Sequence, residues 1–257
     1  MVTFAVCASD ARADTFYGGT AVKKGVQNGP AIGLTLKADG SIAGRVRLTY
    51  GCGRKTTIYN VVVVVKGRAN GAAFTASGKT RESSAGLIRY TLTGTLAPDS
   101  ATGRIKLINR CGNRTRDFTL RAASAPAGAP TKPAPSSSYF GTTSQTAAGT
   151  PLPIFLRVAK NGRVYVNSYT VAGCRGFKLN AADSTPSRVV RADGTFVSNQ
   201  RYTVRYKDGS VERYRVNVAG RFLADGVAGT LRIRFTYRDG KAHGSCDTGA
   251  VTWAARP

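Results

Sequence analysis

Apolar and polar residues alternate along several segments of the chain. The segments Gly44–Tyr50, Val211–Val218 and Leu231–Tyr237 each place apolar residues on one side and mainly arginine, threonine or asparagine on the other. A period of two is typical of an antiparallel strand with one buried face. Val61–Val65 is apolar at every position. This run predicts a strand that is covered on both faces or that lies at an interface between domains.

Turn-forming dipeptides separate these segments. Because glycine readily adopts the positive φ of tight hairpin turns, Asp-Gly and Asn-Gly pairs indicate hairpins. No segment shows a convincing helical stripe. We therefore predict an all-β protein with about seven or eight short antiparallel strands per domain, as a sandwich or a partly closed barrel. The dipeptides are Asp39-Gly40, Asn70-Gly71, Asn161-Gly162, Asp193-Gly194, Asp208-Gly209, Asp225-Gly226 and Asp239-Gly240.

The pattern occurs twice. Ala101–Leu107 aligns with Val227–Ile233, and eight earlier positions recur at a constant offset of 122. Such self-similarity predicts two tandem homologous antiparallel β domains, residues 14–122 and residues 138–257. Between them, residues 123–137 are rich in Pro, Ala and Ser, which predicts an exposed, semi-extended spacer. The eight pairs are Tyr17/Tyr139, Gly19/Gly141, Thr20/Thr142, Ile32/Ile154, Leu34/Leu156, Gly40/Gly162, Cys52/Cys174 and Phe74/Phe196.

Residues 1–13 resemble the end of a signal peptide. Met1–Ala8 is apolar, and Ala11–Ala13 fits a small-x-small cleavage pattern, so the mature chain would begin at Asp14. A disordered N-terminal tail is the alternative. No run of about 20 apolar residues predicts a transmembrane helix. We therefore expect a secreted or envelope-associated protein.

Cysteine usage agrees with export. Four cysteines remain after removal of residues 1–13, two in each repeat. The repeat selects the pairs Cys52–Cys111 and Cys174–Cys246 from the three possible pairings. Four buried free thiols are the alternative. A metal site is not expected, because the chain has no CxxC motif and one histidine, His243.

The chain is strongly basic, with a formal net charge of +25 that is spread over both repeats. Such a charge attracts polyanions, and the arginine fork suits phosphate, sulfate and carboxylate groups. A base composition that favours arginine codons is the alternative explanation. The predicted polyanion-binding residues lie on the polar sides of strands: Arg45, Arg47, Arg104, Lys106, Arg201, Arg205, Lys207, Arg213, Arg215, Arg232, Arg234 and Arg238.

Sequence-specific nucleic-acid recognition has little support. Tyr202, Tyr206 and Tyr214 alternate with the arginines, so they fall on the opposite face and favour a place in the core. Only a diffuse, salt-sensitive contact is predicted.

The sequence offers few residues that could form a catalytic site. The single histidine argues against a Ser-His-Asp site, and the two glutamates, Glu82 and Glu212, do not match between the repeats. The segment Ser77–Thr80 ends like a phosphate-binding loop but lacks the first glycine of that motif. We predict no cofactor and no catalytic residue. A hydrolase would have to assemble carboxylates from distant loops.

The segment Cys246–Arg256, read with Tyr139–Gln145, resembles a family of secreted, mostly uncharacterised β-rich actinobacterial proteins. Those proteins open with Y-x-G-x-T-S-Q and end with C-D-[ST]-G-x-V-x-W-x-A-R. The resemblance covers the second repeat, whereas the first has Cys111–Arg114 and no tryptophan. It implies export and a disulfide-stapled β domain, and it brings no catalytic residues.

The leading hypothesis is an exported, non-catalytic binding or structural module that contacts anionic polymers of the cell envelope through arginine-rich strand faces. An envelope-polymer hydrolase and a protein-interaction module that uses a sheet edge are the alternatives.

Overall fold

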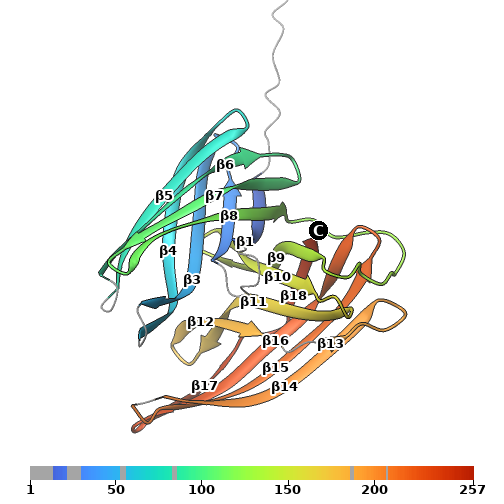
Figure 1. The fold of residues 1–257 in the computed structure, drawn as a ribbon. Coiled ribbons are helices and arrows are strands. Elements are labelled where there is room, and N and C mark those ends of the chain that lie inside the picture. The colour runs from blue at the N-terminus through green and yellow to red at the C-terminus, as the bar shows by residue number, and fades with distance from the viewer. Residues whose placement is uncertain (1–13, 22–29, 53–55, 83–85, 186–187, 207) are drawn as a thin grey trace, which may run out of the picture.

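The computed structural model consists of strands and connecting turns (Figure 1). Side chains are not described for residues 48–52, 56–60 and 182, and the predicted signal-peptide segment lies outside the described residues. The described residues are 14–21, 30–52, 56–82, 86–185, 188–206 and 208–257.

The first eight strands form a closed barrel. Each strand pairs with the next along the chain, and β1 also pairs with β8. The prediction of an all-β fold is confirmed, and its first domain closes fully. The strands are β1 (Thr15–Ala21), β2 (Ala31–Leu36), β3 (Ser41–Cys52), β4 (Thr56–Asn70), β5 (Ala73–Glu82), β6 (Gly86–Leu96), β7 (Ser100–Asn109) and β8 (Gly112–Ala122).

Strand β4 corrects one expectation. Val61, Val63 and Val65 point into the barrel and are buried, but Val64 is 50% exposed. The valine run therefore alternates like any barrel strand and is not covered on both faces.

The other ten strands form a second, more open sheet. Its main order is β12-β11-β10-β9-β18-β16-β15-β14. Strand β17 pairs with both β11 and β16, which closes a ring of β9, β10, β11, β17, β16 and β18. The strands are β9 (Ser138–Ala147), β10 (Thr150–Val158), β11 (Arg163–Cys174), β12 (Phe177–Ser184), β13 (Arg188–Val189), β14 (Thr195–Arg205), β15 (Val211–Leu223), β16 (Gly226–Asp239), β17 (Ala242–Asp247) and β18 (Val251–Arg256).

Equivalent positions of the repeat occupy equivalent places in the two sheets. Tyr17 pairs with Leu34 between β1 and β2, and Tyr139 pairs with Leu156 between β9 and β10. Phe74 lies over Gly94 in the first domain and Phe196 lies over Gly220 in the second, where a Cβ would strike the ring, and each of these glycines is paired with a second glycine on the next strand. The glycines therefore make room for the aromatic side chain at the same place in each domain.

Each domain has its own hydrophobic core. The first cluster is drawn wholly from strands β1–β8, and the second, which includes Trp253, is drawn wholly from β9–β18. No strand pairing links the two sheets among the described residues.

The two domains pack through glycines on β1 and β2. Gly18 and Gly33 pair with one another, and a Cβ at either position would meet the backbone oxygen of Gly141 or Pro151. A side chain at either glycine would push β1 and β2 away from β9 and β10. Thr35 adds a hydrogen bond to the carbonyl of Gly149, 2.9 Å long.

The Pro/Ala-rich segment runs along the second domain. Its side chains are mostly exposed, but its backbone is attached: Thr131 N donates to Phe222 O at 3.1 Å, and Pro130 forms a bridge with Leu223. The carbonyl of Ala125 accepts a hydrogen bond from Arg256. These contacts hold the segment against the ends of β15, β16 and β18.

The Cys174–Cys246 disulfide is present, as predicted. The two cysteines face each other across β11 and β17, with their Cα atoms 4.2 Å apart. The bridge closes a loop of 72 residues, and on the chain-entropy model such a loop contributes roughly 4 kcal/mol. Cys111 is also disulfide-bonded. The side chain of its predicted partner, Cys52, lies outside the described part of the structure.

We expect peptide mapping under non-reducing conditions to link Cys52 with Cys111 and Cys174 with Cys246. The physical reason is that each bridge then closes within one domain, in agreement with the two separate cores. A peptide that joins a cysteine of residues 14–122 to one of residues 138–257 would contradict the prediction.

Candidate polyanion-binding surface

Three arginines lie directly opposite one another on adjacent strands. In the register of β14, β15 and β16, Arg201 pairs with Arg215 and Arg215 pairs with Arg234. All three side chains are exposed. Directly paired residues of antiparallel strands share one face, and neighbouring strands lie about 4.8 Å apart. The three guanidinium groups therefore form a row across the sheet.

Further basic residues occupy the neighbouring rows of the same face. Arg213 lies two residues from Arg215, Arg205 lies beyond Thr203 on β14, and Arg232 and Arg238 lie on either side along β16. Residues two apart on a strand are separated by about 7 Å. We call this face, with Arg201, Arg205, Arg213, Arg215, Arg232, Arg234 and Arg238, the arginine surface.

The arginine surface contains a hollow of about 780 Å³. Three complete rows of paired residues line it. The outer two are Arg201, Arg215, Arg234 and Asp247, and Thr203, Arg213, Thr236 and Ser245; the row between them is Tyr202, Tyr214, Phe235 and Cys246. Gly173 and Cys174 at the end of β11, and Arg175 after it, complete the lining on that side. Arginine forks and hydroxyl groups, which can all donate hydrogen bonds, thus converge on one depression.

Sequence reasoning missed Arg175, Thr203, Thr236 and Ser245. Arg175 directly follows Cys174. The predicted disulfide between Cys174 and Cys246 could therefore have placed Arg175 beside β17. The hydroxyl residues carried no signal, because only the strand register places them between arginines.

The arginine row is unfavourable without a counter-charge. Like charges directly opposite on paired strands destabilise a sheet by up to about 1 kcal/mol for each pair. Asp247 follows Arg234 in the same row and is the one carboxylate that lines the hollow. Arg201 and Arg215 lie further from this carboxylate and form no ion pair within the described residues. An anion that binds over the row would relieve this repulsion.

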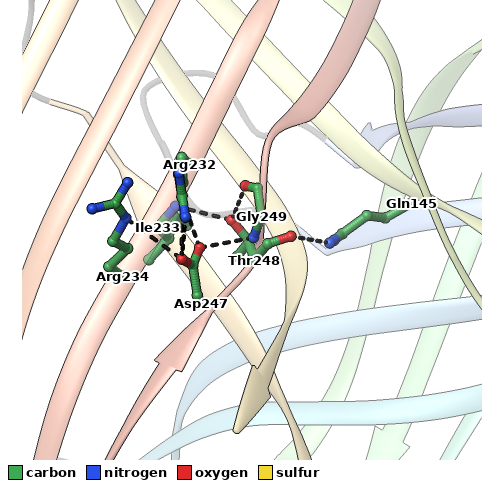
Figure 2. A network of polar contacts seen from close by, with 7 residues as sticks. All are labelled: Gln145, Arg232, Ile233, Arg234, Asp247, Thr248 and Gly249. Atoms are coloured by element: carbon green, nitrogen blue, oxygen red, sulfur yellow. Dashed lines mark hydrogen bonds and ion pairs between the residues drawn. The ribbon is translucent and has the colours of Figure 1, made fainter.

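Asp247 neutralises the β16 end of the surface (Figure 2). Its carboxylate accepts hydrogen bonds from Arg232 Nε at 3.0 Å and from the backbone N–H of Gly249 at 2.8 Å, and Arg234 Nε lies 3.5 Å away. The Arg232 hydrogen bond is the main reason why the pKa of Asp247 is lowered. Asp247 therefore stays ionised and bound to arginine at neutral pH.

Gln145 and Thr248 join the two ends of the second repeat. The Gln145 side chain donates to Val171 O at 3.0 Å and to Thr248 O at 3.1 Å, and its own oxygen accepts from Val171 N. Figure 2 shows Gln145 reaching toward the Asp247–Gly249 turn. Thr248 Oγ1 accepts a hydrogen bond from Ile233 N. The segments Tyr139–Gln145 and Cys246–Arg256, which carry the resemblance noted in the sequence, thus help to close the ring at β17.

Aromatic residues occupy the opposite face of β14–β16. Tyr202 stacks on Tyr214 with ring centroids 4.8 Å apart, and Tyr214 stacks on Phe235 at 4.9 Å. The tyrosines pack against the second core. The predicted place in the core is therefore right for Tyr202 and Tyr214 but wrong for Tyr206, which is 44% exposed and donates a hydrogen bond to Glu212 at 2.6 Å.

Most predicted basic residues of the first domain do not gather into a surface. Arg104 is exposed and forms an ion pair with Asp117 at 3.1 Å. Lys106 pairs with Thr91 and Thr115, and the next basic residue of that row, Lys66, is three strands away. Arg45 lines a separate hollow that β9 and β12 also border. Lys207 lies outside the described residues.

Arg47 is a correction. It is only 6% exposed, because β3 faces the second domain at this point. Its Nη1 donates to Ala181 O at 3.1 Å, and its guanidinium lies 5.3 Å from the ring centroid of Tyr169. Burial lowers the pKa of Arg47 to about 10. Arg47 holds the two domains together and is not available to a polymer.

No protein-family model and no curated protein matches the chain. A structural comparison finds similarity to the crystal structure of a "putative outer membrane protein" of Bacteroides fragilis, with 11% identity, a TM-score of 0.28 and coverage of 96% of this chain and 98% of that one. A likeness at this TM-score supports no conclusion about the present chain. Within the described residues, no helix is long and apolar enough to span a membrane, and no cluster of three or more potential ligands could hold a metal ion.

Replacing Asp247 with Asn should destabilise the protein by about 1 kcal/mol at pH 7, since the ion pairs are partly exposed and screened. The pKa of Asp247 is lower in the folded protein than in the unfolded chain, where it is about 4. The stabilisation by the Asp247 carboxylate is therefore fully present above about pH 4 and is lost as the pH falls through the folded pKa. Urea unfolding at pH 7 and at about pH 2 measures this. An equal difference between D247N and wild type at both pH values would contradict the role of the charge.

Proposed function

We propose that the protein is an exported, non-catalytic module that binds an anionic polymer of the cell envelope through the arginine surface of its second domain. The observation that carries this proposal is the row of Arg201, Arg215 and Arg234 on three adjacent strands. Such a row repels itself in the free protein and is compensated by bound anions. Export is supported by the apolar N-terminal segment and by the Cys174–Cys246 disulfide.

The spacing of the surface suits a flexible chain of anionic groups. Cationic positions recur about every 4.8 Å across the strands and about every 7 Å along them. Long arginine side chains adjust over several ångströms, so they can follow phosphate or sulfate groups that repeat on that scale. Electrostatic contacts of this kind carry little sequence or sugar specificity and depend strongly on salt.

The first domain contributes to affinity only through its overall charge. Its longest row of directly paired basic residues in the described register is Lys79 opposite Arg89, and Arg104 is already paired with Asp117. The second domain therefore carries the specific surface, and the first domain carries the diffuse field that attracts the polymer.

The hydrolase alternative has weaker support. It requires two positioned carboxylates, of which one holds a proton. Asp247, which lines the hollow, has a lowered pKa and is bound by Arg232 and Arg234. A carboxylate in this state is a poor general acid.

Binding to poly(glycerol phosphate), measured by biolayer interferometry between about 50 and 200 mM salt, tests the proposal. In the variant R201Q/R213Q/R215Q, three cationic contacts are lost. We expect affinity to fall about tenfold or more and the salt slope to decrease by about 2. These three arginines do not touch Asp247, so the fold should be retained.

The matched control is K66Q/R89Q/K106Q, which removes the same charge from exposed positions of the first domain. The affinity of this control variant for the polymer should fall by no more than about threefold. Equal losses in the two variants would mean that net charge alone binds the polymer, and the proposed surface would be wrong.

A further inference from the structure

The second sheet is open along one seam where the first barrel is closed. In the first domain, β4 and β5 pair from Lys66–Asn70 to Ala73–Ser77 and so complete the barrel. The strands at the corresponding places of the second sheet are β12 and β14, and they end its strand order without pairing. In Figure 1, the strands β14–β17 extend past β12 at the lower left of the view. The border between β12 and β14 is the seam.

Both borders of the seam present free backbone. Strand β14 pairs with β15 along all eleven of its residues. At the start of its other edge, Arg191 N donates to Thr195 O and Arg188 of β13 reaches Ser198, and beyond Ser198 that edge has no strand partner in the described part of the chain. Strand β12 pairs with β11 and likewise has an unpaired edge there. An unpaired strand edge is a template for the addition of another strand.

Side chains reach across the seam in place of backbone hydrogen bonds. Tyr202 on β14 donates to Asp183 on β12 at 2.9 Å, and Arg188 on β13 donates to Ser198 on β14 at 3.0 Å. From the first bridge to the second, the residue number falls along β14 and rises from β12 to β13. The two borders of the seam therefore run antiparallel.

A buried carboxylate on the seam is incompletely satisfied. Asp183 is 7% exposed, and its Oδ2 has no hydrogen-bond partner within the described structure. A buried polar atom without a partner costs free energy, which a bound donor would recover.

Exposed apolar side chains gather along the same borders. Of the six large apolar residues that are exposed in the described chain, four lie on β12, β13 or β14, and Tyr206 directly follows β14. The sixth, Val64, lies on the first barrel. The five on the seam are Phe177, Leu179, Val189, Val197 and Tyr206. Apolar exposure concentrated along two free edges indicates an interaction site.

We propose that the seam is a strand-acceptor site, which binds an extended peptide segment of a protein partner by pairing with the free edge of β14. The site requires no contact with the polymer, although an added strand would lie beside Arg201 and Arg205 of the arginine surface.

The two faces of the sheet determine the side chains of the partner. Outward-facing residues of an added strand would lie beside Arg201 and Arg205, which favours acidic side chains. Inward-facing residues would lie near Leu179 and Tyr202, which favours apolar side chains. The partner segment should therefore alternate apolar and acidic residues.

A fluorescein-labelled nine-residue peptide of alternating Val and Glu is the probe. We expect saturable binding to the full chain by fluorescence anisotropy at about 150 mM salt. The same peptide with N-methyl groups on alternate residues keeps its charge but loses strand pairing, so its affinity should fall about tenfold or more. Equal affinity of the two peptides would show attraction by charge alone and would overturn the proposal.

Two chain variants localise the binding. L179D places a charge on the inward side of the seam and should weaken binding about tenfold or more. V64D makes the same change at an exposed valine of the first barrel and should leave binding unchanged. Equal effects of the two variants, or no binding of the unmethylated peptide, would also overturn the proposal.

The variant R201Q/R213Q/R215Q separates this inference from the proposed function. It should abolish most polymer binding and, because Arg201 also lies beside the added strand, weaken both peptides alike. The tenfold difference between the methylated and unmethylated peptides should remain. A dimer in light scattering that L179D dissociates would place a second copy in the seam, and the peptide proposal would be wrong.

Discussion

The pairing of β17 with both β11 and β16 is the constraint on which the second domain depends. It closes a ring of six strands before β12 or β14 is reached, and the Cys174–Cys246 bridge fixes it covalently. Asp247, next in the chain, ties the same place to Arg232 and Arg234. Strands β14 and β15 continue the sheet beyond β16 outside this ring, and their inward side chains, among them Phe196 and Phe222, remain in the second core.

This early closure produces both proposed sites. Strands β14–β16 carry the arginines on the face that points away from the core, where they form adjacent rows. The early closure also leaves the β14 edge unpaired across from β12. In the first barrel β4 and β5 pair instead, and the longest described row of directly paired basic residues has two members, Lys79 and Arg89. The two domains thus share strand order but differ in the surface they offer.

Much of this was visible in the chain. The alternation of apolar residues in Leu231–Tyr237 correctly assigned strand and buried face, because period two has one structural meaning in a half-buried strand. The repeat correctly selected Cys174–Cys246. Arg47 was assigned to an exposed surface, since its side of β3 is polar in sequence, and packing of β3 against Tyr169 could not be read from a single strand.

The sequence alone determined the all-β class, the location of the strands, the face on which each arginine lies and one disulfide. These are local properties, set by residue period, turn glycines and a repeated spacing. Only the tertiary structure decided which arginines become neighbours, where the second ring closes and which strand edges stay open. Those features depend on the register between strands that are far apart in the chain. The alternation of apolar and polar residues shows which face of a strand is buried, but it does not show which strand it pairs with.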